Sequence, residues 1–144
     1  MNIASSLIAV LLYFFATGAQ ARRLRLGNGQ QLSRGALCFG AIAITAHFVA
    51  AVSAIATPMG ADLGLSQLFS LLTGLICAIT LGASLRRPIH NLLLALFPLA
   101  ILAITLELLL PGQQVGEKHS AGMCRHIILS IFAYSMRTIA AVQA

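Results

Sequence analysis

The segment ALCFGAIAITAHFVAAVSAIAT, residues 36–57, contains no Asp, Glu, Lys or Arg. A helix needs about 20 mostly apolar residues to cross the hydrocarbon core of a bilayer, and this segment has that length. It therefore predicts a membrane-spanning helix, with lipid as its solvent.

Four further segments have, or nearly have, the same length and apolar character. The five predicted helices cover residues 3–20, 36–57, 65–85, 91–110 and 123–144. Each break between them contains Gly or Pro, which interrupt helices. We therefore predict an all-α fold, a polytopic membrane helix bundle of about five transmembrane helices, with residues 1–144 forming a single transmembrane domain.

The composition of the whole chain agrees with this prediction. Of its 144 residues, 59% are hydrophobic and 8% are charged, whereas a soluble domain carries about 25% charged residues. The mean hydropathy is +0.94. The net charge of +6 does not indicate a nucleic-acid partner, because the basic residues lie in the breaks and form no stripe. The predicted partner is a lipid bilayer.

The basic residues also predict the orientation. Most of them gather in the first and third breaks: Arg22, Arg23, Arg25, Arg34, Arg86 and Arg87. The opposite side carries Lys118, with Arg125 at its margin. Since cytoplasmic loops are enriched in Lys and Arg, we expect the N-terminus outside the cytoplasm. The expected location is the bacterial inner (plasma) membrane, with several passes.

His47 lies near the middle of the second predicted helix. Its same-face neighbours are alanines: Ala43, Ala50, Ala51 and Ala54. A titratable side chain at this depth usually faces the protein interior, and the small neighbours are expected to leave an open slot beside the imidazole. Such a slot suits a flat cofactor such as haem, for which histidine can be an axial ligand. A histidine hydrogen-bonded to a neighbouring helix is the other interpretation.

His126 begins a polar seam on the last predicted helix. Ser130, Ala133 and Arg137 follow on the same helical face, and this face is expected to point inward. Arg137 could pair with an acidic group of a ligand or extend toward the cytoplasmic interface.

Other chemistry has weak support in the sequence. His119, His126 and Glu107 could form an outer metal or carboxylate site, but their spacing matches no ligand motif. The chain contains no GxGxxG, P-loop, nucleophile elbow or HExxH motif. The prediction is that the protein is not an enzyme and has no catalytic residue.

Three stretches resemble one known family. Residues 65–80, LSQLFSLLTGLICAIT, look like its third helix, and residues 122–135, GMCRHIILSIFAYS, are similar to its pattern of Gly, His and then Leu-Ser-Phe-x-Tyr. His47, within ITAHFVAA (44–51), matches its second-helix histidine. The family is that of the cytochrome c assembly proteins (CcsA/CcmC/HemX type), in its YpjD-like branch.

The resemblance implies a polytopic inner-membrane protein that handles haem during cytochrome c biogenesis. On this interpretation haem is the cofactor, and His47 and His126 are the candidate ligands of the haem iron, with no other metal site. The partners would be haem and other cytochrome c maturation proteins. The resemblance covers about the N-terminal half of a usual family member, so the chain is expected to be truncated relative to the family.

Two alternatives remain open from the sequence. One is a small proton-coupled transporter that uses Glu107 and the histidines, since intramembrane acids often mark such pathways. The other is a non-catalytic assembly subunit that binds partners through a stripe of small residues, which permits close helix packing in lipid. This stripe consists of Ser66, Ser70, Gly74, Ala78 and Gly82.

Overall fold

Five α-helices make up most of the chain in the computed structural model, which describes residues 3–27, 32–57, 60–61, 64–86, 89–110 and 121–143. The helices are α1 (Ile3–Arg25), α2 (Arg34–Ile55), α3 (Leu65–Ser84), α4 (Leu93–Leu109) and α5 (Ala121–Gln143). The short strands β1 (Ala56–Thr57) and β2 (Gly60–Ala61) pair antiparallel, and η1 (His90–Leu92) is a 3₁₀ turn before α4. The all-α prediction is confirmed, and each observed helix overlaps a predicted one.

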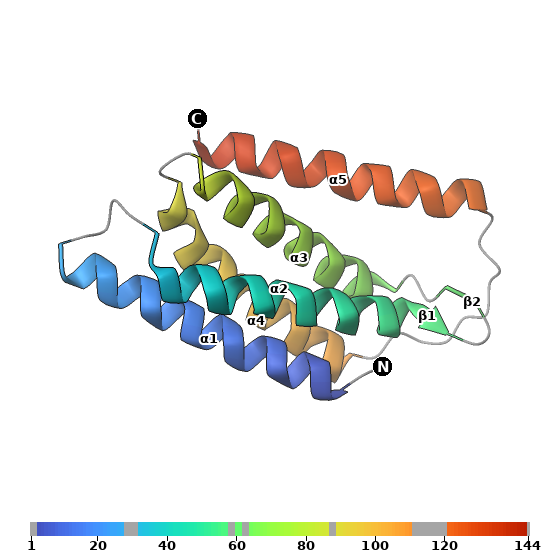
Figure 1. Cartoon of the computed structure of the whole chain (residues 1–144). Coiled ribbons are helices and arrows are strands. Elements are labelled where there is room, and N and C mark those ends of the chain that lie inside the picture. Colours follow the sequence, from blue (N-terminus) through green and yellow to red (C-terminus); the bar gives the residue numbers. More distant parts are fainter. Residues whose placement is uncertain are drawn as a thin grey trace.

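The first four helices form a bundle, and α5 lies on its outside (Figure 1). In this bundle α1 packs against α2 and α4, and α3 packs against α2 and α4. The main contact of α5 is with α3. Short connections make successive helices run in opposite directions, so the start of α1, the end of α2, the start of α3 and the end of α4 meet at one end.

Two helix ends differ from the prediction by several residues. Helix α1 continues to Arg25, because arginine is a good helix former and its charge is favourable in the last turn of a helix. Helix α2 ends at Ile55 instead of Thr57, and Ala56 and Thr57 are extended. The reason is Pro58, which disfavours the α conformation in the residue before it.

The described arginines at the α1–α2 connection and after α3 lie at one end of the bundle (Figure 1). Arg22, Arg25, Arg34 and Arg86 are exposed there, and Arg23 donates a hydrogen bond to the carbonyl oxygen of Leu32 at 3.0 Å. The predicted grouping of these arginines is therefore present in the structure. Arg87 lies outside the described residues.

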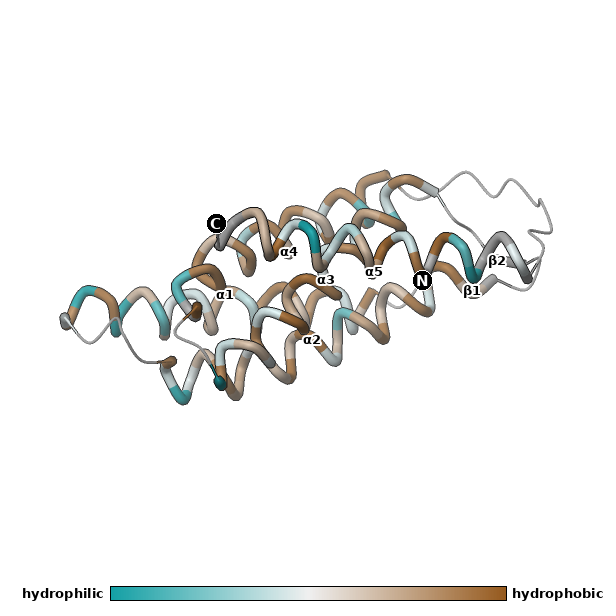
Figure 2. Tube along the Cα trace, turned by 90° about the horizontal axis from the view of Figure 1, so that it is seen from above, coloured by the Kyte–Doolittle hydropathy of each residue, from teal (hydrophilic) through white to brown (hydrophobic). Residues whose placement is uncertain are grey.

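Within the described residues, three helices are long and apolar enough to cross a membrane: α1, α2 and α3. Helix α4 is apolar but shorter, with 17 residues. Helix α5 is long enough to span a membrane, but Arg125, His126 and Arg137 lower its hydropathy. It is therefore not among the helices that are apolar enough to cross. Hydrophobic residues dominate the helices, and hydrophilic ones gather where α1 ends (Figure 2). The fold thus contains helices whose length and hydropathy suit several passes across a membrane.

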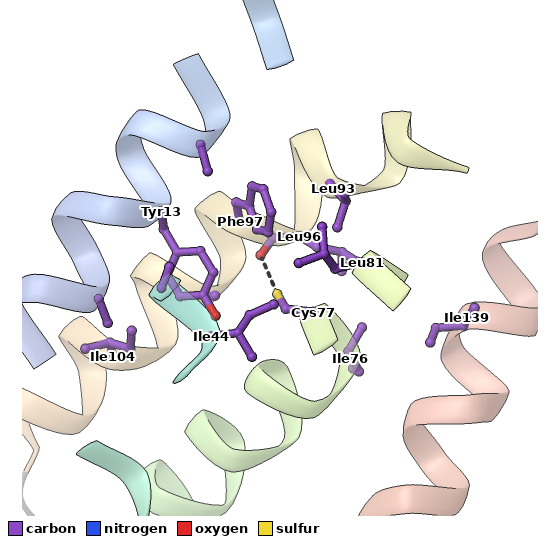
Figure 3. Packing of buried hydrophobic residues seen from close by; sticks show 14 residues of the cluster. Tyr13, Ile44, Ile76, Cys77, Leu81, Leu93, Leu96, Phe97, Ile104 and Ile139 are labelled. Carbon is purple, nitrogen blue, oxygen red and sulfur yellow. Dashed lines mark hydrogen bonds between the residues drawn. The ribbon is translucent and has the colours of Figure 1, made fainter. Parts of the chain in front are cut away.

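The apolar core lies where α1, α2, α3 and α4 meet (Figure 3). Tyr13 and Phe97 are both fully buried, with ring centroids 5.3 Å apart. Phe97 lies against Gly40 of α2 so closely that a Cβ atom at that glycine would be 2.9 Å from the ring. Small residues on α2 therefore allow an aromatic pair to fill the centre of the bundle.

Candidate functional site: a polar chain inside the bundle

His47 lies at the centre of a hydrogen-bonded chain that joins three helices. Its side chain is 1% exposed. Nδ1 is 3.2 Å from the Tyr13 hydroxyl of α1, and Nε2 is 2.9 Å from the Ser70 hydroxyl of α3. Both partners are fully buried. The interior position expected from the sequence is confirmed, and the structure has the hydrogen bonds to neighbouring helices of the second interpretation.

The two hydrogen bonds of His47 constrain each other. A neutral imidazole has one N–H donor and one acceptor nitrogen. If Tyr13 donates to Nδ1, then Nε2–H donates to Ser70; if Ser70 donates to Nε2, then Nδ1–H donates to Tyr13. The direction of one hydrogen bond therefore fixes the direction of the other, and the imidazole couples α1 to α3.

The expected open slot beside His47 is filled, which corrects the prediction. The alanines of α2 are buried as expected, but Gly74 of α3 packs against the ring. A Cβ atom at Gly74 would be 3.3 Å from two atoms of the imidazole. The Tyr13 ring covers another side, edge-on, with centroids 5.8 Å apart. The small residues that suggested a cofactor slot thus allow the helices themselves to approach.

A buried carboxyl group extends the polar chain to the fourth helix. Glu107, in the last turn of α4, is 3% exposed. Neither of its oxygens has a hydrogen-bond partner among the described residues. The end of α4 lies against the start of α3, because the Ser66 hydroxyl donates a hydrogen bond to the carbonyl oxygen of Leu110 at 2.9 Å, and Ser70 and Glu107 each lie about one helical turn from this contact. Tyr13, His47, Ser70 and Glu107 therefore place one polar side chain from each of four helices in the interior, a set that we call the interior polar chain.

A thiol continues this set beyond Tyr13. Cys77 of α3 lies in the same buried core cluster as Tyr13. Its thiol also donates a long hydrogen bond, 3.6 Å, to the carbonyl oxygen of Leu96, drawn as a dashed line in Figure 3. The interior polar chain therefore ends in apolar packing on this side and in an unpaired carboxyl group on the other.

The polar seam of α5 does not point inward, contrary to expectation. His126, Ala133 and Arg137 are exposed and Ser130 is half-buried, whereas Ser135 and Ile139 are buried among the α5 side chains that the structure describes. The reason is that Ile139 joins the apolar core cluster, and this rotates the seam away from α3. His126 therefore presents an accessible imidazole and is not brought together with His47.

The outer cluster is not formed by the residues that the structure describes. Glu107 is buried and His126 is exposed, and His119 lies outside the described residues. Across the described ranges there is no group of three His, Cys, Asp or Glu side chains that could hold a metal ion.

Sequence reasoning found His47 and Glu107 but missed their connection. In the sequence Ser70 stands out only as a member of the small-residue stripe, yet its hydroxyl lies 2.9 Å from Nε2 of His47. Tyr13 belongs to no motif in the sequence. The available signal was that it is one of only two tyrosines in the chain and lies within an otherwise apolar segment, where a buried hydroxyl needs a partner.

Comparison with known proteins identifies no relative of this chain. No family model matches the chain, and no curated protein or solved structure is similar to it. The resemblance to the cytochrome c assembly proteins therefore stays a prediction from the sequence.

Proposed function

We propose that the protein is a multi-pass protein of a bacterial inner (plasma) membrane, in which all five helices cross or enter the bilayer. The arginine-bearing end of the bundle would face the cytoplasm, with the N-terminus outside. The exposed arginines at that end support this orientation. A topology reporter fused after Gly27 should be active only as a cytoplasmic reporter, and activity as an external one would reverse the assignment.

We further propose that the protein handles haem during cytochrome c assembly. The support is the resemblance of three separate segments to that family, together with the accessible imidazole of His126. Haem would supply an iron centre that needs an axial ligand, and neutral imidazole provides one. The proposal concerns binding or presentation of haem, with other cytochrome c maturation proteins as partners, and no catalytic step.

The two candidate ligands fit haem to different degrees. His47 has both ring nitrogens engaged and Gly74 against its face, so a haem iron does not fit there in the packed bundle. His126 is exposed on α5, so its ring is free of that steric restriction. The single observation that carries the proposal is this difference, which favours His126 as the ligand and gives His47 a structural role.

An absorption spectrum of the detergent-purified protein tests the proposal. With haem supplied during expression, we expect a Soret band that His126→Ala weakens strongly. His47→Gln should retain ligation but lower stability. A folded protein with no haem signal would refute the proposal and favour the alternative of a non-catalytic assembly subunit.

The buried Glu107 favours a second candidate, proton-coupled transport. Ionisable residues inside a membrane commonly mark ion or proton pathways, and Glu107 is a buried member of the interior polar chain. Proton-driven uptake by reconstituted vesicles, lost in Glu107→Gln, would support it. An unchanged proton flux in that variant would refute it.

A further inference from the structure

We propose that Glu107, Ser70 and His47 form a buried proton-exchange site, in which the carboxyl group holds a proton and the hydroxyl relays it to Nε2 of the imidazole. This site lies apart from His126 and does not depend on haem binding. Its ligand is the proton itself.

The first step of the argument is the state of Glu107. Its carboxyl group is buried, and neither oxygen has a hydrogen-bond partner in the part of the chain that the structure describes. A buried carboxylate without such partners is strongly destabilised relative to the neutral acid. Glu107 also lies in the last turn of α4, where the helix dipole disfavours negative charge. Both effects favour a carboxyl group that retains its proton.

The second step is the charge around this carboxyl group. Helix α4 packs against α1, α3 and η1, and α3 contains no Lys or Arg. The arginines of α1 lie in its last turn, at the opposite end of the bundle. The titratable groups along the chain of contacts are His47, Tyr13 and Cys77.

The third step is the path from the acid to the base. The Ser70 hydroxyl lies 2.9 Å from Nε2 of His47. It is about one helical turn from Ser66, whose hydroxyl donates to the carbonyl oxygen of Leu110, so this part of α3 lies against the end of α4 that carries Glu107. A hydroxyl can accept one hydrogen bond while it donates another. In the tautomer with Nδ1–H donating to Tyr13, Nε2 is the acceptor, and Ser70 donates to it. Glu107 is then the group that can donate to the Ser70 oxygen.

Transfer along this path conserves atoms and charge. The Glu107 O–H bond breaks as the proton binds the Ser70 oxygen, and the original Ser70 O–H bond breaks as its proton binds Nε2. The products are a carboxylate and an imidazolium ion, so the net charge is unchanged. Loss of the Nδ1 proton as the pH rises then leaves the Nε2–H tautomer, with Tyr13 donating to Nδ1.

Infrared spectroscopy can detect the proton on Glu107. The chain has only three acidic side chains, and a neutral carboxyl group has a carbonyl-stretch band separate from carboxylate bands. We expect this band at neutral pH in the folded protein. Glu107→Gln, which keeps the side-chain size, should remove it, while Asp62→Asn should leave it. Ser70→Ala should shift its frequency, whereas Thr73→Ala on the same helix should not, because the Thr73 hydroxyl donates to carbonyl oxygens of α3 itself.

Nitrogen-15 NMR of labelled histidine tests the relay separately. As Glu107 ionises, the protonated nitrogen of His47 should change from Nδ1 to Nε2, and this change should be absent in Glu107→Gln. His47→Gln identifies the signal. A folded protein without the infrared band, or a band that persists in Glu107→Gln, would overturn the proton-holding site. Ionisation of Glu107 with no change at His47 would overturn the relay.

Discussion

Replacing Tyr13 with Phe tests whether the hydrogen bond to His47 stabilises the bundle. The substitution removes one buried oxygen and keeps the ring that packs on Phe97. Because Tyr13 is fully buried and His47 is 1% exposed, bulk water cannot replace the lost partner. Nδ1 of His47 is then left without a hydrogen bond.

The expected cost follows from that orphaned nitrogen. Interhelical hydrogen bonds in membrane proteins contribute about 0.6 kcal/mol on average and up to about 1.7 kcal/mol. Leaving a buried polar group unsatisfied costs roughly 1–3 kcal/mol. The imidazole can limit this cost by placing its N–H toward Ser70, so we expect a loss of about 1–2 kcal/mol in the free energy of unfolding, a factor of roughly 5–30 in the equilibrium.

Reversible unfolding by increasing SDS in mixed micelles, followed by circular dichroism, measures this loss. Tyr134→Phe is the matched control, because Tyr134 is 65% exposed on α5 and its substitution should change stability by less than about 0.5 kcal/mol. Equal stability of Tyr13→Phe and this control would refute the structural role given to the hydrogen bond.

A double-mutant cycle with Ser70→Ala sharpens the same test. With one partner removed, the tautomer can direct the N–H to the partner that remains. With both removed, the N–H is unsatisfied whichever tautomer forms. The double variant should therefore lose more stability than the sum of the single losses, with a coupling energy of about 0.5–3 kcal/mol. Additive losses would contradict the coupling through His47.

Two further predictions concern packing and access. Gly40→Ala should lower the free energy of unfolding by about 1–3 kcal/mol, because the added Cβ would lie 2.9 Å from the Phe97 ring. Gly82→Ala is the control and should not be destabilising, because its Cβ would have nothing within 4 Å. Equal effects of the two substitutions in SDS unfolding would argue against this helix crossing. A variant whose only cysteine is the exposed Cys38 should react with a maleimide in mild detergent, whereas a variant whose only cysteine is the buried Cys77 should react only after unfolding. Mass spectrometry measures the labelling of both variants. Rapid labelling of Cys77 would contradict the packing of α3.

Helix positions were predictable because they depend on local properties of the chain. Apolar length and the Gly- and Pro-containing breaks placed all five helices near their observed bounds. The inward position of His47 was also predictable, because a titratable group in an apolar helix avoids lipid. The outward position of the α5 seam was not predictable, because it depends on which face of α5 meets α3. Both faces of α5 contain apolar side chains, so hydropathy does not choose between them.

The sequence alone determined the number of helices, their apolar character and the grouping of arginines at one end, because these follow from hydropathy and charge along the chain. Only the tertiary structure decided what His47 contacts. Its partners Tyr13 and Ser70 are 34 and 23 residues away in sequence, and small residues such as Gly74 can accommodate either a flat ligand or a neighbouring helix. Which one fills the space depends on how the helices cross, and that is a property of the packed bundle, set by side chains on several helices at once.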